Sequence, residues 1–155
     1  MPALPEIGSG LPEMRRVIGL AILAAAVGIS ACSAPSAPSS AGTVTLGGET
    51  WTVLDGGKDG MRGRADFGGA DAMLFRFDPG LDTQRIVWVM DGVAFPLDIA
   101  WFYEDGALVG TASMALCPAK PCTTYAADGP YRSALEAPVG AFDDLEPTDR
   151  LVIDD

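Results

Sequence analysis

The sequence predicts a mainly β fold, namely a compact sandwich or small barrel of about seven or eight short strands with one or two short helical turns. Three observations support this prediction. Short runs rich in β-branched and aromatic residues recur along the chain, and turns containing Gly, Pro and Asp separate them. No segment of residues 43–155 has apolar residues at a spacing of about 3.6 over the length of a helix.

Residues 43–69, at the start of the domain, predict a hairpin followed by a long loop. Runs at 43–46 and 50–54 are rich in β-branched residues, and the Gly-Gly pair between them fits a tight turn. The next stretch, 55–69, contains six glycines, so it is expected to form a loop. One helical turn is expected inside this loop, around Met61.

The remaining elements are bounded by turn residues. Asp105-Gly106 is the strongest hairpin signal of the chain, and Asp91-Gly92 marks another break between strands. A second helical turn is expected at 140–145. The further strands are predicted at 72–77, 85–90, 97–103, 107–114, 131–136 and 150–153.

Residues 1–31 have the pattern of a leader with a secretory signal peptide. Arg15 and Arg16 precede an uncharged apolar run at 17–29, and small residues follow it. The run is shorter than the roughly 20 residues that a helix needs to cross a bilayer, so cleavage is expected rather than a permanent span. The acidic segment before Met14 is unusual for such a signal, which makes Met14 an alternative start of translation.

The end of this leader resembles the lipobox of bacterial lipoproteins. Ile29, Ser30 and Ala31 precede Cys32, and the resemblance implies cleavage before Cys32 and acylation of its sulfur. Two or more acyl chains would then hold the protein on a membrane. An ordinary secretory signal is the alternative. The expected location is the bacterial cell envelope, facing the periplasm or the exterior, and Ser33 favours the outer membrane if the bacterium is Gram-negative.

A short tether is predicted between the anchor and the folded domain. Residues 33–42 consist of Ser, Ala, Pro and Gly, so residues 32–42 are expected to connect a lipidated cysteine to a domain at 43–155. The formal charge of the chain is -11, and the leader contributes none of it because its two basic and two acidic residues cancel. This acidity excludes nucleic acid as a partner.

The chain contains no histidine and three cysteines. Without histidine, neither a Ser/His/Asp or Cys/His relay nor an imidazole metal ligand can form. If Cys32 carries lipid, Cys117 and Cys122 remain as an even pair, which we expect to form a disulfide that shapes a Pro-rich loop. The alternative is redox or zinc chemistry, but the spacing is not CxxC and two thiolates fall short of four zinc ligands. No metal and no other cofactor is expected.

A series of motifs spans the predicted domain. They are GMRGR at 60–64, MLF at 73–75 with Phe77, WVM at 88–90, FPLDIAW at 95–101, Asp105-Gly106, the paired cysteines with Tyr125, and Leu135-Glu136. Their order resembles that of the DUF192 family. The resemblance covers about residues 51–153, and it implies a compact, mainly β domain that is often exported and has no established biochemical activity.

The chain departs from the family pattern in two places. The family usually has lysine, asparagine and threonine before the PLD turn, where this chain has Asp91, Gly92 and Val93. If that polar trio serves a family site, this member has lost it. The leucine-methionine pair of the early motif is Met61 and Arg62 here, which replaces an apolar side chain by a charge.

Two carboxylates are candidates for chemistry. Asp98 lies in one of the most apolar stretches of the chain, where a carboxylate is desolvated unless it is paired. Its candidate partners are Arg85, Arg132 and Arg150. If Asp98 and Glu136 converged in a cleft, they could act as acid and base on a glycosidic bond. In the alternative interpretation, Asp98 accepts hydrogen bonds from a turn and Glu136 faces solvent.

Aromatic side chains beside acidic groups are the second candidate feature, because they form sugar-binding surfaces. Trp88 and Trp101 are expected in the core, and the ligand-binding candidates are Asp98, Arg85, Tyr125 and Arg132. The sequence favours a lipid-anchored envelope domain that binds a small ligand, a glycan or an envelope protein without catalysis. The alternatives are a carboxylate-dependent hydrolase of envelope or extracellular polysaccharide and a structural accessory subunit.

Overall fold

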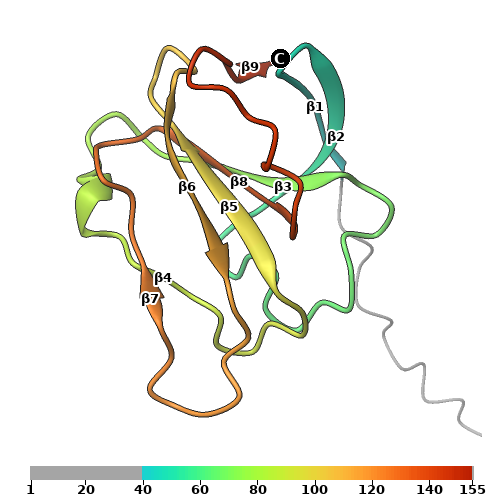
Figure 1. The fold of residues 1–155 in the computed structure, drawn as a ribbon, viewed down its shortest axis with the longest axis vertical. Helices are drawn as coiled ribbons and strands as arrows, with labels where there is room; N and C mark the ends of the chain where they lie inside the picture. Colours follow the sequence, from blue (N-terminus) through green and yellow to red (C-terminus); the bar gives the residue numbers. More distant parts are fainter. Residues whose placement is uncertain (1–39, 155) are drawn as a thin grey trace, which may run out of the picture. The chain divides into compact units, whose positions relative to one another are not determined.

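The structure, a computed structural model, describes residues 40–154 and contains nine strands and one short 3-10 helix in that range (Figure 1). The mainly β fold predicted from the sequence is confirmed. The elements in chain order are β1 Ser40–Leu46, β2 Glu49–Asp55, β3 Ala72–Arg76, η1 Thr83–Arg85, β4 Trp88–Val89, β5 Leu97–Phe102, β6 Leu108–Met114, β7 Thr124–Tyr125, β8 Ser133–Pro138 and β9 Val152–Ile153.

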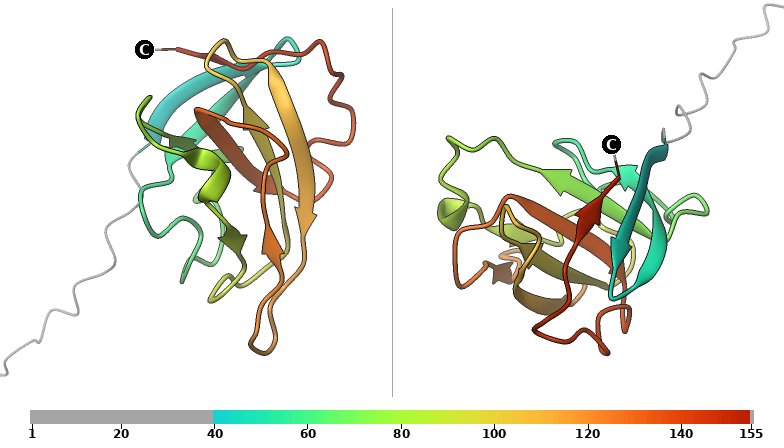
Figure 2. Two further views of the ribbon diagram at one scale, coloured as in Figure 1. Left: turned by 90° about the vertical axis from the view of Figure 1, so that its left-hand side faces the viewer. Right: turned by 90° about the horizontal axis from the view of Figure 1, so that it is seen from above.

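Seven of these strands form one curled sheet in the order β6-β5-β8-β3-β2-β1-β9, and β4 pairs with β7 in a small second sheet (Figure 2). All pairs are antiparallel except β2 and β3, which are parallel. A bridge between Ala107 and Arg150 joins the β5–β6 turn to the segment before β9. Elements from opposite ends of the sheet order therefore meet at this point.

Both predicted hairpins are confirmed. Gly47 and Gly48 connect β1 to β2 with φ angles of 57° and 82°, in the left-handed region that glycine tolerates. Asp105 and Gly106 connect β5 to β6, and the Asp105 side chain accepts a hydrogen bond from the backbone N–H of Ala107 at 3.0 Å.

Several predicted boundaries differ from the structure. The predicted strand at 85–90 is reduced to β4, because η1 precedes it and the Thr83 hydroxyl anchors this helix by bonding the backbone of Tyr131. The turns around Met61 and at 140–145 are not helical, and β7 was not predicted. β1 starts at Ser40, within the stretch assigned to the tether, because it continues its pairing with β2 through a bulge.

Both faces of the long sheet are buried at its central strands β3, β5 and β8. In β5 every residue is buried, with Leu97, Ile99 and Trp101 in one hydrophobic cluster and Ala100 and Phe102 in the other. The loop after β2 supplies buried residues to the first cluster, and the segment between β8 and β9 supplies them to the second. A side chain on a central strand therefore lies under a second layer whichever face it occupies.

The leader, the lipobox with Cys32 and most of the tether lie outside the described residues. In the part of the chain that the structure describes, no helix is long and apolar enough to span a membrane.

Candidate functional site

The candidate site is a pocket of about 290 Å³ on the face of the long sheet that carries Ile99 and Glu136. The glycine-rich loop at 57–62 forms one side, and the segment 86–93 around β4 forms the other. Phe75, Phe77 and Trp88 supply aromatic wall, and Glu136 lines the pocket from β8. The pocket thus combines an apolar lining with one carboxyl group from a central strand, which is the usual character of a small-molecule site.

Glu136 is held in this position by the register of three strands. It pairs with Met73 of β3 on one side and with Ile99 of β5 on the other, so the three side chains share one face. Glu136 is only 7% exposed, and its Oε2 atom is buried with no hydrogen-bond partner in the described part of the chain. Burial raises the pKa of Glu136 from its usual value of 4.5 to about 7.

The aromatic wall is fixed by its own contacts. The indole N–H of Trp88 donates a hydrogen bond to the hydroxyl of Tyr131 at 3.0 Å. The Trp88 ring lies at 86° to that of Phe75 and at 83° to that of Phe77, with centroid distances of 4.8 Å and 6.2 Å. These edge-to-face contacts fix the orientation of the three rings relative to one another.

Two glycines allow the loop to approach this wall. A Cβ atom on Gly56 would overlap the ring of Phe75. A Cβ atom on Gly60 would lie 3.2 Å from the same ring and 3.6 Å from Oε2 of Glu136, and the φ of Gly60 is +53°. In the sequence these glycines predicted only a loop. In the structure they also leave room for the pocket, because larger residues would fill the space beside the Glu136 carboxyl group.

The charged residues of the pocket other than Glu136 form ion pairs. Arg62 contacts Asp91 at 3.3 Å, and Lys58 contacts Asp59 at 2.7 Å. The hydrogen bond from Lys58 holds the pKa of Asp59 below its usual value. Both pairs are at least partly exposed, unlike Glu136. Glu136 takes part in none of the ion pairs formed by the described residues.

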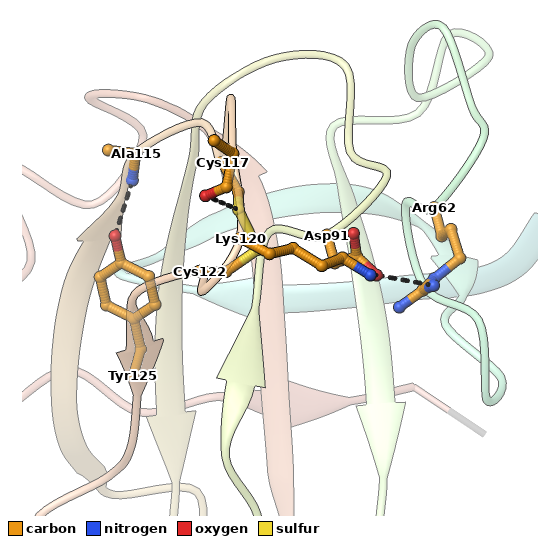
Figure 3. Close-up of a disulfide and its surroundings, with 8 residues drawn as sticks. Arg62, Asp91, Ala115, Cys117, Lys120, Cys122 and Tyr125 are labelled. Carbon is orange, nitrogen blue, oxygen red and sulfur yellow. Dashed lines mark hydrogen bonds and ion pairs between the residues drawn. A yellow bond between two sulfur atoms is a disulfide. The ribbon is translucent and has the colours of Figure 1, made fainter.

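The disulfide loop reaches the same rim. Cys117 and Cys122 form the predicted disulfide, with an S–S distance of 2.02 Å, in the loop between β6 and β7. Lys120 in this loop contacts Asp91 at 3.2 Å, so Asp91 lies between Lys120 and Arg62 (Figure 3). The disulfide thus shapes a loop whose lysine joins the ion pair at the rim of the pocket.

Comparisons with known proteins identify the family of this chain. The family model for DUF192, described as an uncharacterised ACR, matches residues 55–153, which is well over half of the chain. The chain belongs to the DUF192 family. Curated proteins include no match to it.

Two crystal structures share the fold of this DUF192 member. A protein of unknown function from Novosphingobium aromaticivorans DSM 12444 is 21% identical, with a TM-score of 0.60, and the match covers 72% of this chain and 84% of that one. A "putative transcription regulator" from Sinorhizobium meliloti 1021 is 23% identical, with a TM-score of 0.55, and the match covers 70% and 90%. At these identities the similarity supports the fold alone.

The two departures from the DUF192 pattern meet at the pocket. Arg62 and Asp91 are residues at which this chain is expected from its sequence to differ from the family pattern. They form the ion pair described above, and a Cβ atom on Gly92 would lie 3.1 Å from the Arg62 side chain. The residues that distinguish this chain from the pattern are therefore neighbours at the pocket rim.

The structure does not bring Asp98 and Glu136 together. Asp98 is opposite Ala137, whereas Glu136 is opposite Ile99, so the two carboxyl groups point to opposite faces of the sheet. Asp98 accepts a hydrogen bond from the backbone N–H of Gly140 at 2.7 Å, as in the turn-bonding interpretation. The expected acid–base pair does not form, and the expectation of a solvent-facing Glu136 is wrong, because the loop at 57–62 and its neighbours cover that face.

The other ligand-binding candidates have contacts outside the pocket. Arg85 is exposed and pairs with Asp82, and the Tyr125 hydroxyl accepts a hydrogen bond from the backbone N–H of Ala115 at 2.9 Å (Figure 3). Arg150 pairs with Asp105 at 3.1 Å. Arg85, Arg132 and Arg150 are thus engaged with groups other than Asp98. In residues 40–154, no group of three or more side chains is placed to hold a metal ion.

Arg132 has a structural role that can be tested. Its guanidinium donates hydrogen bonds to the carbonyls of Pro79, Tyr131 and Leu81, at 2.7, 3.0 and 3.3 Å. We expect Arg132→Ala to lower the free energy of unfolding by about 2 kcal/mol, because charge-assisted bonds to carbonyls are lost. Urea titration followed by tryptophan fluorescence measures this change.

Arg85→Ala is the matched control. The Arg85 side chain is 87% exposed in its contact with Asp82, so its removal is expected to change the free energy of unfolding by less than about 0.5 kcal/mol. Equal losses in the two variants would contradict the role assigned to Arg132.

Proposed function

We propose that this protein is a lipid-anchored domain of the bacterial cell envelope that binds a small organic ligand in the pocket over Glu136, without catalysing a reaction. The observation that carries the proposal is the buried Oε2 atom of Glu136, which has no hydrogen-bond partner among residues 40–154. An unsatisfied buried acceptor costs roughly 1–3 kcal/mol, and a donor group of a ligand would remove this cost. A group that is expensive to bury and is not used by the fold points to a role in binding.

The pocket favours a small ligand over a glycan or a protein. Its volume of about 290 Å³ is at the lower end of the range of small-molecule sites. Among the large apolar side chains that are exposed in the described residues, the only aromatic one is Tyr103, so these residues offer no broad aromatic platform on which sugar rings could stack.

The position of Asp98 argues for binding rather than hydrolysis by an Asp98–Glu136 pair. A two-carboxylate glycosidase needs both groups on the same substrate, with a separation of roughly 5–10 Å. Asp98 faces the opposite cluster and is engaged with a backbone amide.

Ligand binding can be tested on protein purified from its own envelope. Native mass spectrometry of the full-length protein should show a small-molecule adduct that is absent from Glu136→Leu. The control is Glu104→Gln, which removes a carboxylate from the exposed β5–β6 turn and should retain the adduct. An adduct that persists in Glu136→Leu would place the ligand elsewhere and contradict the pocket assignment.

The anchor rests on the lipobox-like sequence before Cys32. We expect labelled palmitate to be incorporated into the wild-type protein and to be lost in Cys32→Ala, with release of the protein from the membrane fraction. Ser33→Ala, which leaves the cysteine in place, should keep the label. Unchanged membrane association of Cys32→Ala would show that another feature holds the protein there.

A further inference from the structure

We infer that the pocket over Glu136 recognises an organic ammonium ion, with the ammonium group against the Glu136 carboxylate and a short apolar stem along the aromatic wall. The inference deepens the proposed function and rests on it. It names the chemical class of the ligand from the groups that the pocket presents.

The innermost polar group of the pocket is an acceptor without a cation. The residues opposite Glu136 in the sheet, Met73 and Ile99, are fully buried and apolar. The cations that line the pocket, Lys58 and Arg62, are already paired with Asp59 and Asp91. A cation supplied by the ligand would therefore provide the missing partner, and the low polarity of the surroundings would strengthen the interaction.

The wall suits the same ligand. Phe75, Phe77 and Trp88 line the pocket, and the Trp88 ring is nearly perpendicular to the other two. Aromatic side chains that line a cavity attract organic cations, and they bury the apolar stem that carries the charge. The two effects act on different parts of one molecule.

Ligands of other charge fit less well. An anion would approach the Glu136 carboxylate and enter a domain of strongly negative net charge, which repels it over a long range. A sugar carries many hydroxyl groups, and most of them would lose water against the aromatic wall without gaining partners. At the rim the cations Lys58, Arg62 and Lys120 already neutralise Asp59 and Asp91, so Glu136 is the carboxyl group of the pocket that a ligand cation can neutralise.

Three probes of one shape test this inference: 2-phenylethylamine, 2-phenylethanol and phenylacetate. Each is titrated calorimetrically into the full-length protein at about pH 8, where the amine is protonated and most of the Glu136 carboxyl is ionised. We expect 2-phenylethylamine to bind at least about tenfold more tightly than either of the others, since one ionic hydrogen bond is worth more than about 1.4 kcal/mol in such a site.

The variants separate charge from shape. Glu136→Gln keeps the size of the side chain but removes its charge, so it should lose the tenfold preference for the amine. Glu104→Gln, which removes one exposed carboxylate, should retain the preference. A preference that survives in Glu136→Gln would show that the general negative charge of the domain, and not this carboxyl group, selects the amine, and would overturn the inference.

The failure of this inference is distinct from that of the proposed function. Binding of 2-phenylethanol or phenylacetate as tight as that of the amine would overturn the ammonium class and leave the pocket as a ligand site. Failure of all three probes to bind the wild-type protein would also overturn it. The adduct found by native mass spectrometry in the wild-type protein and lost in Glu136→Leu decides the proposed function independently.

Discussion

Gly106→Ala is expected to lower the free energy of unfolding by about 4 kcal/mol. The φ of Gly106 is +79°, a conformation that costs an alanine roughly 1–2 kcal/mol. A Cβ atom at this position would also overlap the backbone carbonyl oxygen of Leu151, which cannot move aside as a flexible side chain could. The overlap adds roughly 1–3 kcal/mol, as overpacking of a close contact does.

The effect is large because Gly106 joins distant elements. Its carbonyl accepts a hydrogen bond from the N–H of Leu151 at 2.9 Å, where the β5–β6 turn meets the segment that leads to β9. Displacing Leu151 would disturb the buried cluster to which its side chain belongs. Urea unfolding followed by tryptophan fluorescence measures the loss.

Gly48→Ala is the matched control, since Gly48 has nearly the same φ, +82°, but nothing lies within 4 Å of a Cβ atom placed there. Its expected cost is only about 1 kcal/mol, from backbone strain alone. A loss in Gly106→Ala no larger than that in Gly48→Ala would show that the contact with Leu151 relaxes easily.

The same glycine shows what the sequence could predict. Asp105-Gly106 identifies a hairpin because a tight turn needs its residues in adjacent positions, so the signal is local. The contact with Leu151 joins residues that are distant in the chain, and no local pattern reports it. For the same reason the alternation of apolar residues located most strands, whereas the parallel pairing of β2 with β3 and the position of β8 between β5 and β3 emerged only from the structure.

The shortest strands escaped prediction for a different reason. β4 and β7 have two residues each, which is too short for a period of two to be recognised. Their pairing, Trp88 with Tyr125, joins β4 to the segment that follows the disulfide loop, which is distant from β4 in the chain. The cysteine count predicted that loop correctly.

The candidate site was only partly predictable. The apolar neighbours of Asp98 correctly indicated burial, and the expected hydrogen bond from a turn is present. Glu136 was expected in solvent because the sequence does not show what covers a strand. Residues 133–137 are all buried, although successive side chains point to opposite faces of the sheet. An alternation of apolar and polar residues is therefore missing from this strand, and the sequence does not indicate which way Glu136 points. The available signal was a glutamate within an otherwise uncharged strand.

The pH dependence of stability should report the burial of Glu136. Its pKa is raised from 4.5 to about 7, so between these pH values the folded state holds a proton that the unfolded state has released. The contribution of Glu136 to stability is therefore most favourable below about pH 4.5, declines as the pH rises towards 7, and is constant above that. The raised pKa corresponds to a decrease of about 3 kcal/mol in the free energy of unfolding between pH 4.5 and about pH 7.

Glu136→Gln isolates this contribution, because the amide does not titrate and every other group is unchanged. The free energy of unfolding of the variant minus that of the wild-type protein should increase by about 3 kcal/mol between about pH 4.5 and about pH 8. Urea titrations of both proteins at several pH values measure it, and Glu104→Gln controls for the loss of one carboxylate. A difference that is constant with pH would mean that Glu136 is as well solvated in the folded protein as in the unfolded chain. Because a buried, unpaired carboxyl group also carries the binding proposal, this measurement tests its physical basis without any ligand.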